Sequence, residues 1–504
     1  MTAIQDHGGQ NVLDEIDRPS KRRNGRNRGR VAVAAFVTLL TLSAVLAIVV
    51  LTVPMERQTV GLLILASTVT LMMSGVHVAV AMALPSLLGL WVVGGPATLN
   101  YALEQIPRTS VASWSLSVIP MFIFMGLMIS RAGLAEVVFH AAKQWIGGVP
   151  GGLGVATIFA GAGMSAASGS TLGVTYATSR IGIPEMLRAG YSPSMATGTV
   201  AMAGTLKMLI PPSITVVIYA GIAQTPVGPQ LLAGVIPGAI LALLFGILIV
   251  VRGKLNPGLA PGVPMDGVTW KGRGIALLQA WPVALLLLII VGGMQSGIAT
   301  ATESGALAAL STILISGWMR RRDGIRAFVR QVVGSAMLTV GAVAAIMFLI
   351  ICVNLLTMMI ATSGVVQEIS TFVVDLGLGR TVFLLALVVM YVVLGMFMDE
   401  LAMLLLTVPV LLPILMEYDV NLIWFGVFLI MLCEVGMVVP PVGFLSFVVH
   451  GIAQQPEVNL GHRISLIEVF RGVFWFVVVT IGLILLLVFY PDLALWLPDL
   501  SMGD

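Results

Sequence analysis

The sequence predicts an all-α polytopic membrane protein with two repeats, each containing a re-entrant hairpin and a helix broken at Pro-Pro. Charged residues make up 10% of the chain and hydrophobic residues 58%, whereas about a quarter of the residues in a soluble domain are charged. The segment around Pro211-Pro212 recurs around Pro440-Pro441, at an offset of 229 residues (440 − 211). The same offset pairs Pro184 with Pro413. Double prolines inside apolar segments interrupt backbone hydrogen bonding, which a membrane tolerates only beside a buried or water-filled cavity.

Composition also excludes several classes of protein. The net charge of +3 is too small to indicate a nucleic-acid partner. The two cysteines, Cys352 and Cys433, lie in apolar runs and form no disulfide or metal-binding pattern.

The N-terminal region predicts a tail and one additional helix. Residues 1–30 are polar and rich in arginine, so we expect a disordered basic cytoplasmic tail. Residues 31–57 form an additional N-terminal transmembrane helix, because the apolar run 31–53 is too long for a cleaved signal. The charge of the basic tail could attract anionic membrane lipid. We favour the simpler interpretation that the tail only fixes the N-terminus on the cytoplasmic side.

The first inverted repeat is expected over residues 58–252. Its hairpin spans 151–190, where a Gly/Ser-rich tip divides an apolar stretch that is long enough to enter the membrane and return. Its broken helix spans 195–223. The remaining predicted helices of this repeat are 58–73, 76–93, 114–131 and 229–251.

A cytoplasmic loop over 253–274 precedes the second inverted repeat, over 275–490. Its hairpin spans 380–417 and its broken helix 421–453. Its other predicted helices are 275–293, 302–319, one within 331–360, and 467–490. The acidic segment 491–504 forms a periplasmic tail.

The placement of lysine and arginine orients these segments. With the N-terminus cytoplasmic, every dense basic cluster falls on the cytoplasmic side and the C-terminus is periplasmic; Arg380 is the main outlier. Each repeat has five crossings and one hairpin, so the two repeats are inverted and their hairpin tips meet near the midplane. This is the geometry of secondary transporters, whose binding sites lie at interrupted helices.

Both broken helices and both hairpin tips offer oxygen atoms to a cation such as Na⁺. Helix breaks free backbone carbonyl groups, and hydroxyl groups lie beside them. The candidate cation ligands of the first module are Ser168, Gly169, Ser170, Gly204, Thr205, Pro211 and Ser213. Those of the second module are Gly395, Asp399, Glu434, Gly436, Pro440 and Gly443. The alternative for the broken helices is a kinked core helix without a ligand. The alternatives for Asp399 and Glu434 are that they are protonated, cap helix ends or pair with Lys207.

Four residues are candidates for binding substrate. They are Lys207, Ser170, Thr205 and Arg180. Lys207 places a charge in an unwound segment, where it faces an anionic substrate or neutralises Asp399 or Glu434. Arg180 holds a carboxylate or extends to the cytoplasmic face, the second being favoured. Glu303 is expected to cap a helix.

The motifs resemble the large membrane (permease) subunit of tripartite ATP-independent periplasmic (TRAP) transporters, the C4-dicarboxylate-type large subunit family. The resemblance covers residues 58–490. It is carried by Ser168-Gly-Ser170 through Ile210-Pro-Pro-Ser213, by Thr302-Glu303, and by Gly395-Met-Phe…Asp399 through Pro440-Pro-Val-Gly443.

The resemblance implies a Na⁺-coupled importer of an organic acid across the bacterial inner membrane. It implies a small four-helix membrane subunit and a periplasmic substrate-binding protein as partners, no cofactor besides Na⁺ as coupling ion, and no enzymatic activity. It also implies an inverted-repeat elevator-type transporter, in which the hairpins, the broken helices and helices 229–251 and 467–490 move against the other helices.

The chain departs from the family at three places. Lys207 stands where the family usually has a small residue, and Glu400 stands where it usually has proline. The third departure is the added helix 31–53, which resembles the helix that connects the two subunits in fused versions of these transporters. The fused small subunit itself is not present beside it, so we expect a separately encoded small subunit.

Three other functions compete with this one. A stand-alone Na⁺/dicarboxylate symporter would need no binding protein. An intramembrane enzyme is disfavoured because Ala166-Ala167-Ser168-Gly169 lacks a plausible base in its module and no His-Glu-x-x-His pattern occurs. A channel fits paired hairpins less well than alternating access does. Sugar acids, dicarboxylates, keto acids and amino-acid-like anions all remain as substrates.

Overall fold

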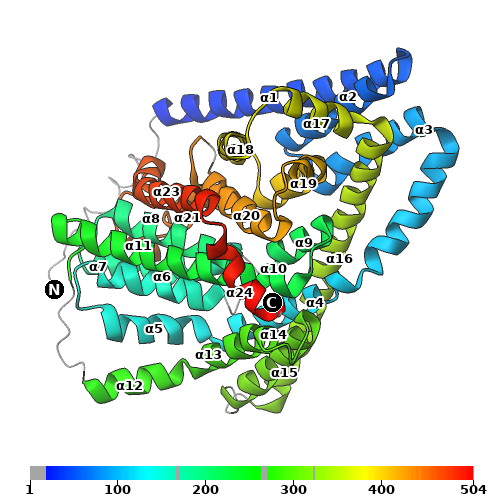
Figure 1. Ribbon diagram of the computed structural model, residues 1–504. Helices are drawn as coiled ribbons and strands as arrows, with labels where there is room; N and C mark the ends of the chain where they lie inside the picture. The colour runs from blue at the N-terminus through cyan, green and yellow to red at the C-terminus, as the bar shows by residue number, and fades with distance from the viewer. Residues whose placement is uncertain are drawn as a thin grey trace. The chain divides into compact units, whose positions relative to one another are not determined.

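The computed structural model describes residues 19–165, 171–262, 269–319, 321, 324–441 and 443–502. Within these ranges all regular secondary structure is helical (Figure 1). Five of the described helices are long and apolar enough to cross a membrane, or seven if each of two bent pairs is one span. The count includes one hairpin arm, Glu400–Glu417, whereas the other hairpin arms and the halves of the broken helices do not enter it because they are too short or too weakly apolar. The prediction of an all-α polytopic membrane protein is confirmed.

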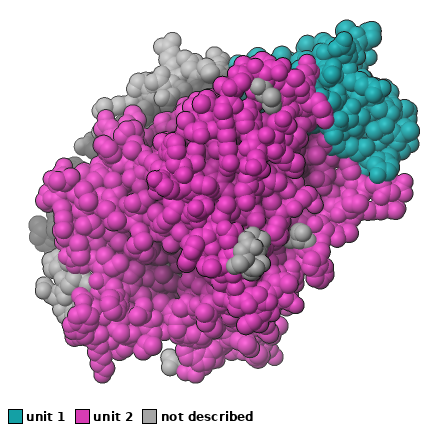
Figure 2. Space-filling view, in the orientation of Figure 1, with its two compact units in different colours: residues 1–102, 358–365 teal, residues 103–357, 366–504 magenta. Residues whose placement is uncertain are grey.

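The chain divides into two compact units, distinguished by colour in Figure 2. The first comprises residues 1–102 and 358–365. It contains α1 (Pro19–Thr52), α2 (Arg57–Met73) and the first part of α3 (Val78–Val111). The Oγ atoms of Ser43 and Ser67 are hydrogen-bonded at 2.8 Å, and a Cβ on Gly61 would lie 2.4 Å from the side chain of Val365. Small residues therefore allow close helix packing in this unit.

Residues 19–30 correct the expectation of a disordered tail over 1–30. Helix α1 begins at Pro19, twelve residues (31 − 19) before the apolar run. Proline is favoured at the first position of a helix, and lysine and arginine have good helix propensity. Extending an existing helix adds one hydrogen bond per residue without a new nucleation cost. Residues 1–18 lie outside the described residues.

The second unit comprises residues 103–357 and 366–504. The helices outside its two broken-helix modules include η1 (Trp114–Leu116), α4 (Val118–Ala132), α5 (Leu134–Ile146), α12 (Trp270–Gln279), α13 (Trp281–Leu287), the π-helical η3 (Leu288–Gly292), α14 (Gly293–Gln295), α15 (Ala301–Met319) and α24 (Asp492–Met502). Most of α16 (Ile325–Ser363) and of α17 (Val365–Asp375) also belongs to this unit. Helices α4 and α15 pack together, and Arg131 on α4 donates to the carbonyl oxygen of Gln331 on α16 at 3.3 Å. Gly133, at φ 77°, lies where α4 turns by 68° toward α5. The segment 491–504, expected as a tail, is helical over α24.

The two modules have matching helices. The first consists of α6 (Gly152–Ser165), α7 (Thr171–Arg188), α8 (Pro193–Thr205), the 3₁₀ turn η2 (Leu206–Met208) and α9 (Ile214–Ala223). The second consists of α18 (Arg380–Gly395), α19 (Glu400–Glu417), α20 (Leu422–Val438) and α21 (Phe444–Ile452). Helices α7 and α19 begin 229 residues apart (400 − 171), as do α8 and α20 (422 − 193). The sequence repeat is therefore also a repeat of helix boundaries.

Local chemistry explains these boundaries. Ser192 caps α8 by accepting from the backbone N–H of Met195 at 3.3 Å, and Asn421, at the equivalent position, caps α20. The Pro211-Pro212 and Pro440-Pro441 bonds are both cis and follow the ends of η2 and α20.

The modules interleave within the second unit. Tyr219 on α9 donates to the carbonyl oxygen of Leu422 at 2.6 Å. Gln230, on α10 (Val227–Ala233), donates to that of Ile423 at 2.9 Å. The module helices also pack with α11 (Val235–Leu255), α22 (Pro456–Asn459) and α23 (Leu466–Phe489). Both modules therefore belong to one compact unit, in which helices of one module pack against helices of the other.

Candidate functional site

A cavity of about 280 Å³ lies among the interrupted helices of the second unit. Four helices begin at its wall: α7 with Thr171, α9 with Ile214 and Thr215, α19 with Glu400, and α21 with Phe444. These are the second arms of both hairpins and the second halves of both broken helices. The N-terminus of a helix carries unpaired N–H groups and roughly half a positive charge. The cavity is therefore suited to an anionic group such as a carboxylate.

Lys207 brings a full charge to this wall. It lies in η2, immediately before the Pro-Pro break, and its side chain is only 2% exposed. Among the described residues, no carboxylate forms an ion pair with its ammonium group. Its electrostatic partner is Glu400, on the opposite module. An ammonium buried in this way is costly unless a partner or ligand compensates it.

Glu400 lines the cavity, whereas in the sequence it stands out only as a departure from the family pattern. Its Oε1 accepts from the hydroxyl of Thr215 on α9 at 3.2 Å. Its Oε2 is buried and accepts no hydrogen bond from the described protein. The feature of the sequence that could have identified Glu400 as a site residue is its position at a hairpin tip, directly after Asp399. Thr215 was missed because a threonine in an apolar helix gives no such signal.

Asp399 also lines the cavity and has a structural role. Its Oδ1 accepts from the backbone N–H of Ala402 at 2.7 Å, so it caps α19. This is the capping alternative weighed from the sequence, and it leaves a cation-binding role as a prediction.

Glu434 lies within α20 and is fully buried, at 0% exposure. Neither of its carboxylate oxygens has a hydrogen-bond partner in the described part of the protein. It interacts electrostatically with Glu400. Two carboxylates that repel each other in this way favour a nearby cation or proton.

The other cation candidates are distributed around the breaks. Thr205 is buried and donates to the carbonyl oxygen of Met202 at 3.0 Å, within its own helix. Ser213 caps α9 and Gly443 precedes α21 at φ 49°. Gly204, Pro211 and Gly436 are buried, Gly395 ends α18, and Pro440 is exposed. Ser168, Gly169 and Ser170 lie outside the described residues.

These positions include few charged ligands for a cation. In the described ranges, no cluster of three or more His, Cys, Asp or Glu side chains is placed to hold a metal ion. A cation at the breaks would therefore depend on carbonyl and hydroxyl oxygens together with one or two acids, as in other broken-helix sites.

Arg180 is placed away from the cavity. Its guanidinium donates to Glu457 on α22 at 2.9 Å and to the hydroxyl of Tyr176 at 3.1 Å. Its side chain is 44% exposed. Glu303 accepts from both the backbone N–H and the hydroxyl of Thr300, at 2.8 Å each, and so caps α15 as expected.

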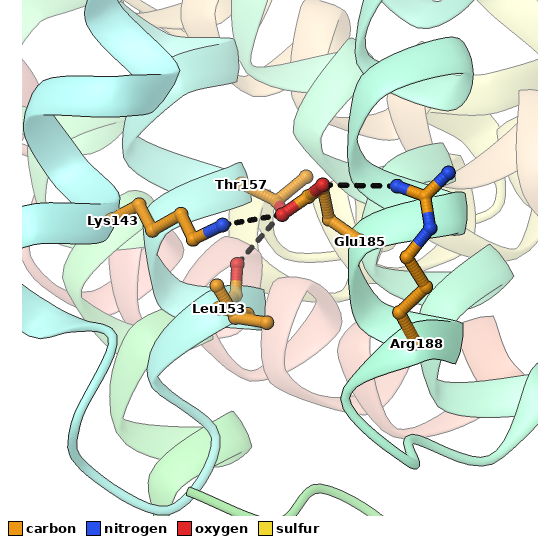
Figure 3. Close-up of polar contacts among 5 residues, drawn as sticks. All are labelled: Lys143, Leu153, Thr157, Glu185 and Arg188. Atoms are coloured by element: carbon orange, nitrogen blue, oxygen red, sulfur yellow. Dashed lines mark hydrogen bonds and ion pairs between the residues drawn. The ribbon is translucent and has the colours of Figure 1, made fainter. Parts of the chain in front are cut away.

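A second charged cluster joins the first hairpin to α5. Glu185 on α7 accepts from Lys143 on α5 and, at 3.1 Å, from Arg188. Figure 3 shows Glu185 between these two cations, with the hydrogen bond from Thr157 to the Leu153 carbonyl oxygen alongside. The cluster is part-exposed, which makes it a packing contact and not a second cavity.

Comparison with known protein families decides the class of this protein. The family model described as "Tripartite ATP-independent periplasmic transporter, DctM component" matches residues 65–493. The chain belongs to this family. It is therefore a TRAP transporter large permease, a multi-pass protein of the inner membrane, and the family is one of permeases and not of enzymes.

Curated relatives share this assignment over most of their length. The C4-dicarboxylate TRAP transporter large permease of Pseudomonas aeruginosa is 31% identical over 387 residues, covering 77% of this chain and 86% of that protein. The Vibrio cholerae protein of the same description is 29% identical, covering 86% and 96%. The ectoine TRAP transporter large permease of Halomonas elongata is 27% identical, covering 87% and 99%.

The fold also resembles a solved transporter. The Alcanivorax borkumensis YdaH transporter, whose crystal structure has been described as having an unusual topology, superposes with a TM-score of 0.57 over 80% of this chain and 89% of that one. The sequence identity is 14%, so this likeness concerns the fold alone.

Proposed function

We propose that this TRAP large permease couples inward movement of Na⁺ to import of a small organic acid. The observation that carries the proposal is the cavity on which four helix N-termini converge beside the buried ammonium of Lys207. Positive helix ends and a fixed cation favour a carboxylate over a neutral solute. The freed carbonyls at the two cis Pro-Pro breaks, together with Asp399 and Glu434, supply oxygens for the coupling ion.

The moving part comprises both hairpins, both broken helices, α11 and α23. Their mutual packing supports this division: α23 packs on α8, and α11 on α6. A Cβ on Gly198 would lie 2.3 Å from the backbone of Gly472, so α8 and α23 are in close contact. We infer that these helices travel together as an elevator against the remaining ones, and that the two repeats are inverted in the membrane.

The family description names a tripartite system, which implies a small membrane subunit and a periplasmic binding protein as partners. A fused permease is known among the relatives, the isethionate TRAP transporter permease of Oleidesulfovibrio alaskensis. We propose that this chain acts with a separate small subunit of four helices. We also propose that the N-terminus of this chain is cytoplasmic and its C-terminus periplasmic.

The proposal is tested by uptake into proteoliposomes that hold this chain with its small subunit. A panel of labelled organic acids is offered with and without the cognate binding protein. Each condition is repeated with an inward Na⁺ gradient and with Na⁺ replaced by choline. Uptake that needs both the binding protein and Na⁺ is the expected result.

Other outcomes would revise specific parts of the proposal. Uptake with Na⁺ but without the binding protein would make the protein a stand-alone symporter, a reading that the family match disfavours. Uptake driven equally well in choline would refute sodium coupling.

A further inference from the structure

The cavity contains polar groups that the described protein leaves without a hydrogen bond or an ion pair. The ammonium of Lys207 has no ion pair there. The Oε2 atom of Glu400 and the hydroxyl of Thr171 are buried and form no hydrogen bond. An unsatisfied buried polar group costs free energy, and a charged one costs more. Two such atoms, Oε2 of Glu400 and the hydroxyl of Thr171, lie around one cavity with an ammonium that has no ion pair, which indicates that a ligand supplies their partners.

The two charged groups lie on different modules. Lys207 belongs to η2 of the first module, whereas Glu400 begins α19 of the second. They influence each other electrostatically without forming an ion pair. A ligand between them meets a positive charge on one wall and a negative charge on the other.

The acidic wall discriminates among carboxylates. Asp399 and Glu400 are adjacent, and both line the cavity. A dicarboxylate would bring its second anionic group toward these two acids, and like charges at short range repel. A hydroxyl group would satisfy Oε2 of Glu400 without balancing its charge, whereas a cationic nitrogen does both, through a charge-assisted hydrogen bond.

We propose that this cavity selects a small zwitterion, with its carboxylate on Lys207 and its cationic nitrogen on Glu400. The inference rests on the proposed function, because it takes the cavity to be the substrate site. It assigns Glu400 the role of a specificity-determining residue. Thr171 supplies an additional hydrogen bond to either end of the ligand.

The test compares solutes that share a four-carbon skeleton: butanoate, 2-aminobutanoate, 4-aminobutanoate and succinate. The protein is the purified complex of the full chain with its small subunit, without the binding protein, in Na⁺ buffer. Half-saturation of thermal stabilisation by each solute is measured for the wild type, Lys207→Met and Glu400→Gln. Exposed Lys254→Met and Glu368→Gln serve as matched controls.

The expected result is that at least one aminobutanoate binds roughly tenfold to a hundredfold more tightly than butanoate or succinate, the effect of one charge-assisted hydrogen bond. Glu400→Gln should abolish this preference but retain binding of butanoate. Lys207→Met should weaken binding of all four solutes. The controls should match the wild type.

Three outcomes would overturn the inference. They are succinate or butanoate binding as tightly as both zwitterions, a zwitterion preference that survives in Glu400→Gln, and wild-type binding by the Lys207→Met/Glu400→Gln double variant. The last would mean that the two charges merely neutralise each other. In each case Na⁺- and binding-protein-dependent uptake of another acid would leave the proposed function intact, whereas absence of any such uptake would refute the proposed function itself.

Discussion

Replacing Gly395 with alanine should separate the second hairpin from the broken helix α20. A Cβ on Gly395 would lie 2.4 Å from Cα of Gly436, whereas ordinary van der Waals contacts are 3.4–4 Å. The two backbones must therefore move apart by at least 0.6 Å (3.0 − 2.4), and by 1.0 Å (3.4 − 2.4) to reach an ordinary contact. Both partners are backbone atoms, so no side-chain rotation can relieve the clash.

Overpacking of this kind typically lowers the free energy of unfolding by about 1 to 3 kcal/mol. This corresponds to a factor of about 5 to 150 in the folding equilibrium constant. The appropriate control is Gly482→Ala on α23, where a Cβ would have no neighbour within 4 Å. Alanine has the higher helix propensity, by up to about 1 kcal/mol. The control should therefore be neutral or stabilising, and the difference between the two variants isolates the clash.

The assay is thermal unfolding of the purified complex with its small subunit, followed by Na⁺-driven uptake in proteoliposomes. Gly395→Ala should unfold at a lower temperature than Gly482→Ala and should transport more slowly. If the two variants unfold at the same temperature, the contact between Gly395 and Gly436 is not a tight one, and the reasoning from close backbone packing is refuted.

Three further predictions concern the charged residues. Asp399→Ala should destabilise the protein by about 0.5 to 2 kcal/mol, since the cap of α19 is lost. Asp399→Asn should keep the wild-type stability but change the Na⁺ concentration that gives half-maximal uptake. If that concentration is unchanged, Asp399 acts only as a helix cap. Glu434→Gln should raise the unfolding temperature in Na⁺-free buffer, since it removes a carboxylate without hydrogen-bond partners. The variant should also be stabilised less than the wild type by added Na⁺. Equal unfolding temperatures of variant and wild type in both buffers would contradict this prediction. Glu185→Gln should lower the free energy of unfolding by only about 0.2 to 1 kcal/mol for each lost ion pair, because Lys143 and Arg188 are 38% and 60% exposed. Unfolding measured at several salt concentrations checks this, and a much larger loss of stability would contradict it.

The sequence predicted much of the helical organisation because the relevant signals are local. Proline pairs, caps such as Asn421 and apolar runs act within a few residues. The matching starts of α7 and α19 follow from the 229-residue repeat. Amphipathic α5 and α17 were not predicted, because they are shorter and less apolar than a membrane span.

The candidate site was predicted in part. Lys207 and Asp399 were identified because a charge in an apolar run is costly and therefore conspicuous. Arg180 was also proposed, but it pairs with Glu457, 277 residues away. No pattern along the chain could indicate that partner.

The sequence by itself therefore determined the membrane class, the two modules and the position of each helix break, since these depend on hydropathy and backbone chemistry. Only the tertiary structure decided that four helix N-termini meet at one cavity and that Glu400 faces it together with Lys207. The physical reason is that these residues come from opposite modules. Their approach depends on how the apolar faces of both modules pack together, a long-range property that local sequence does not encode.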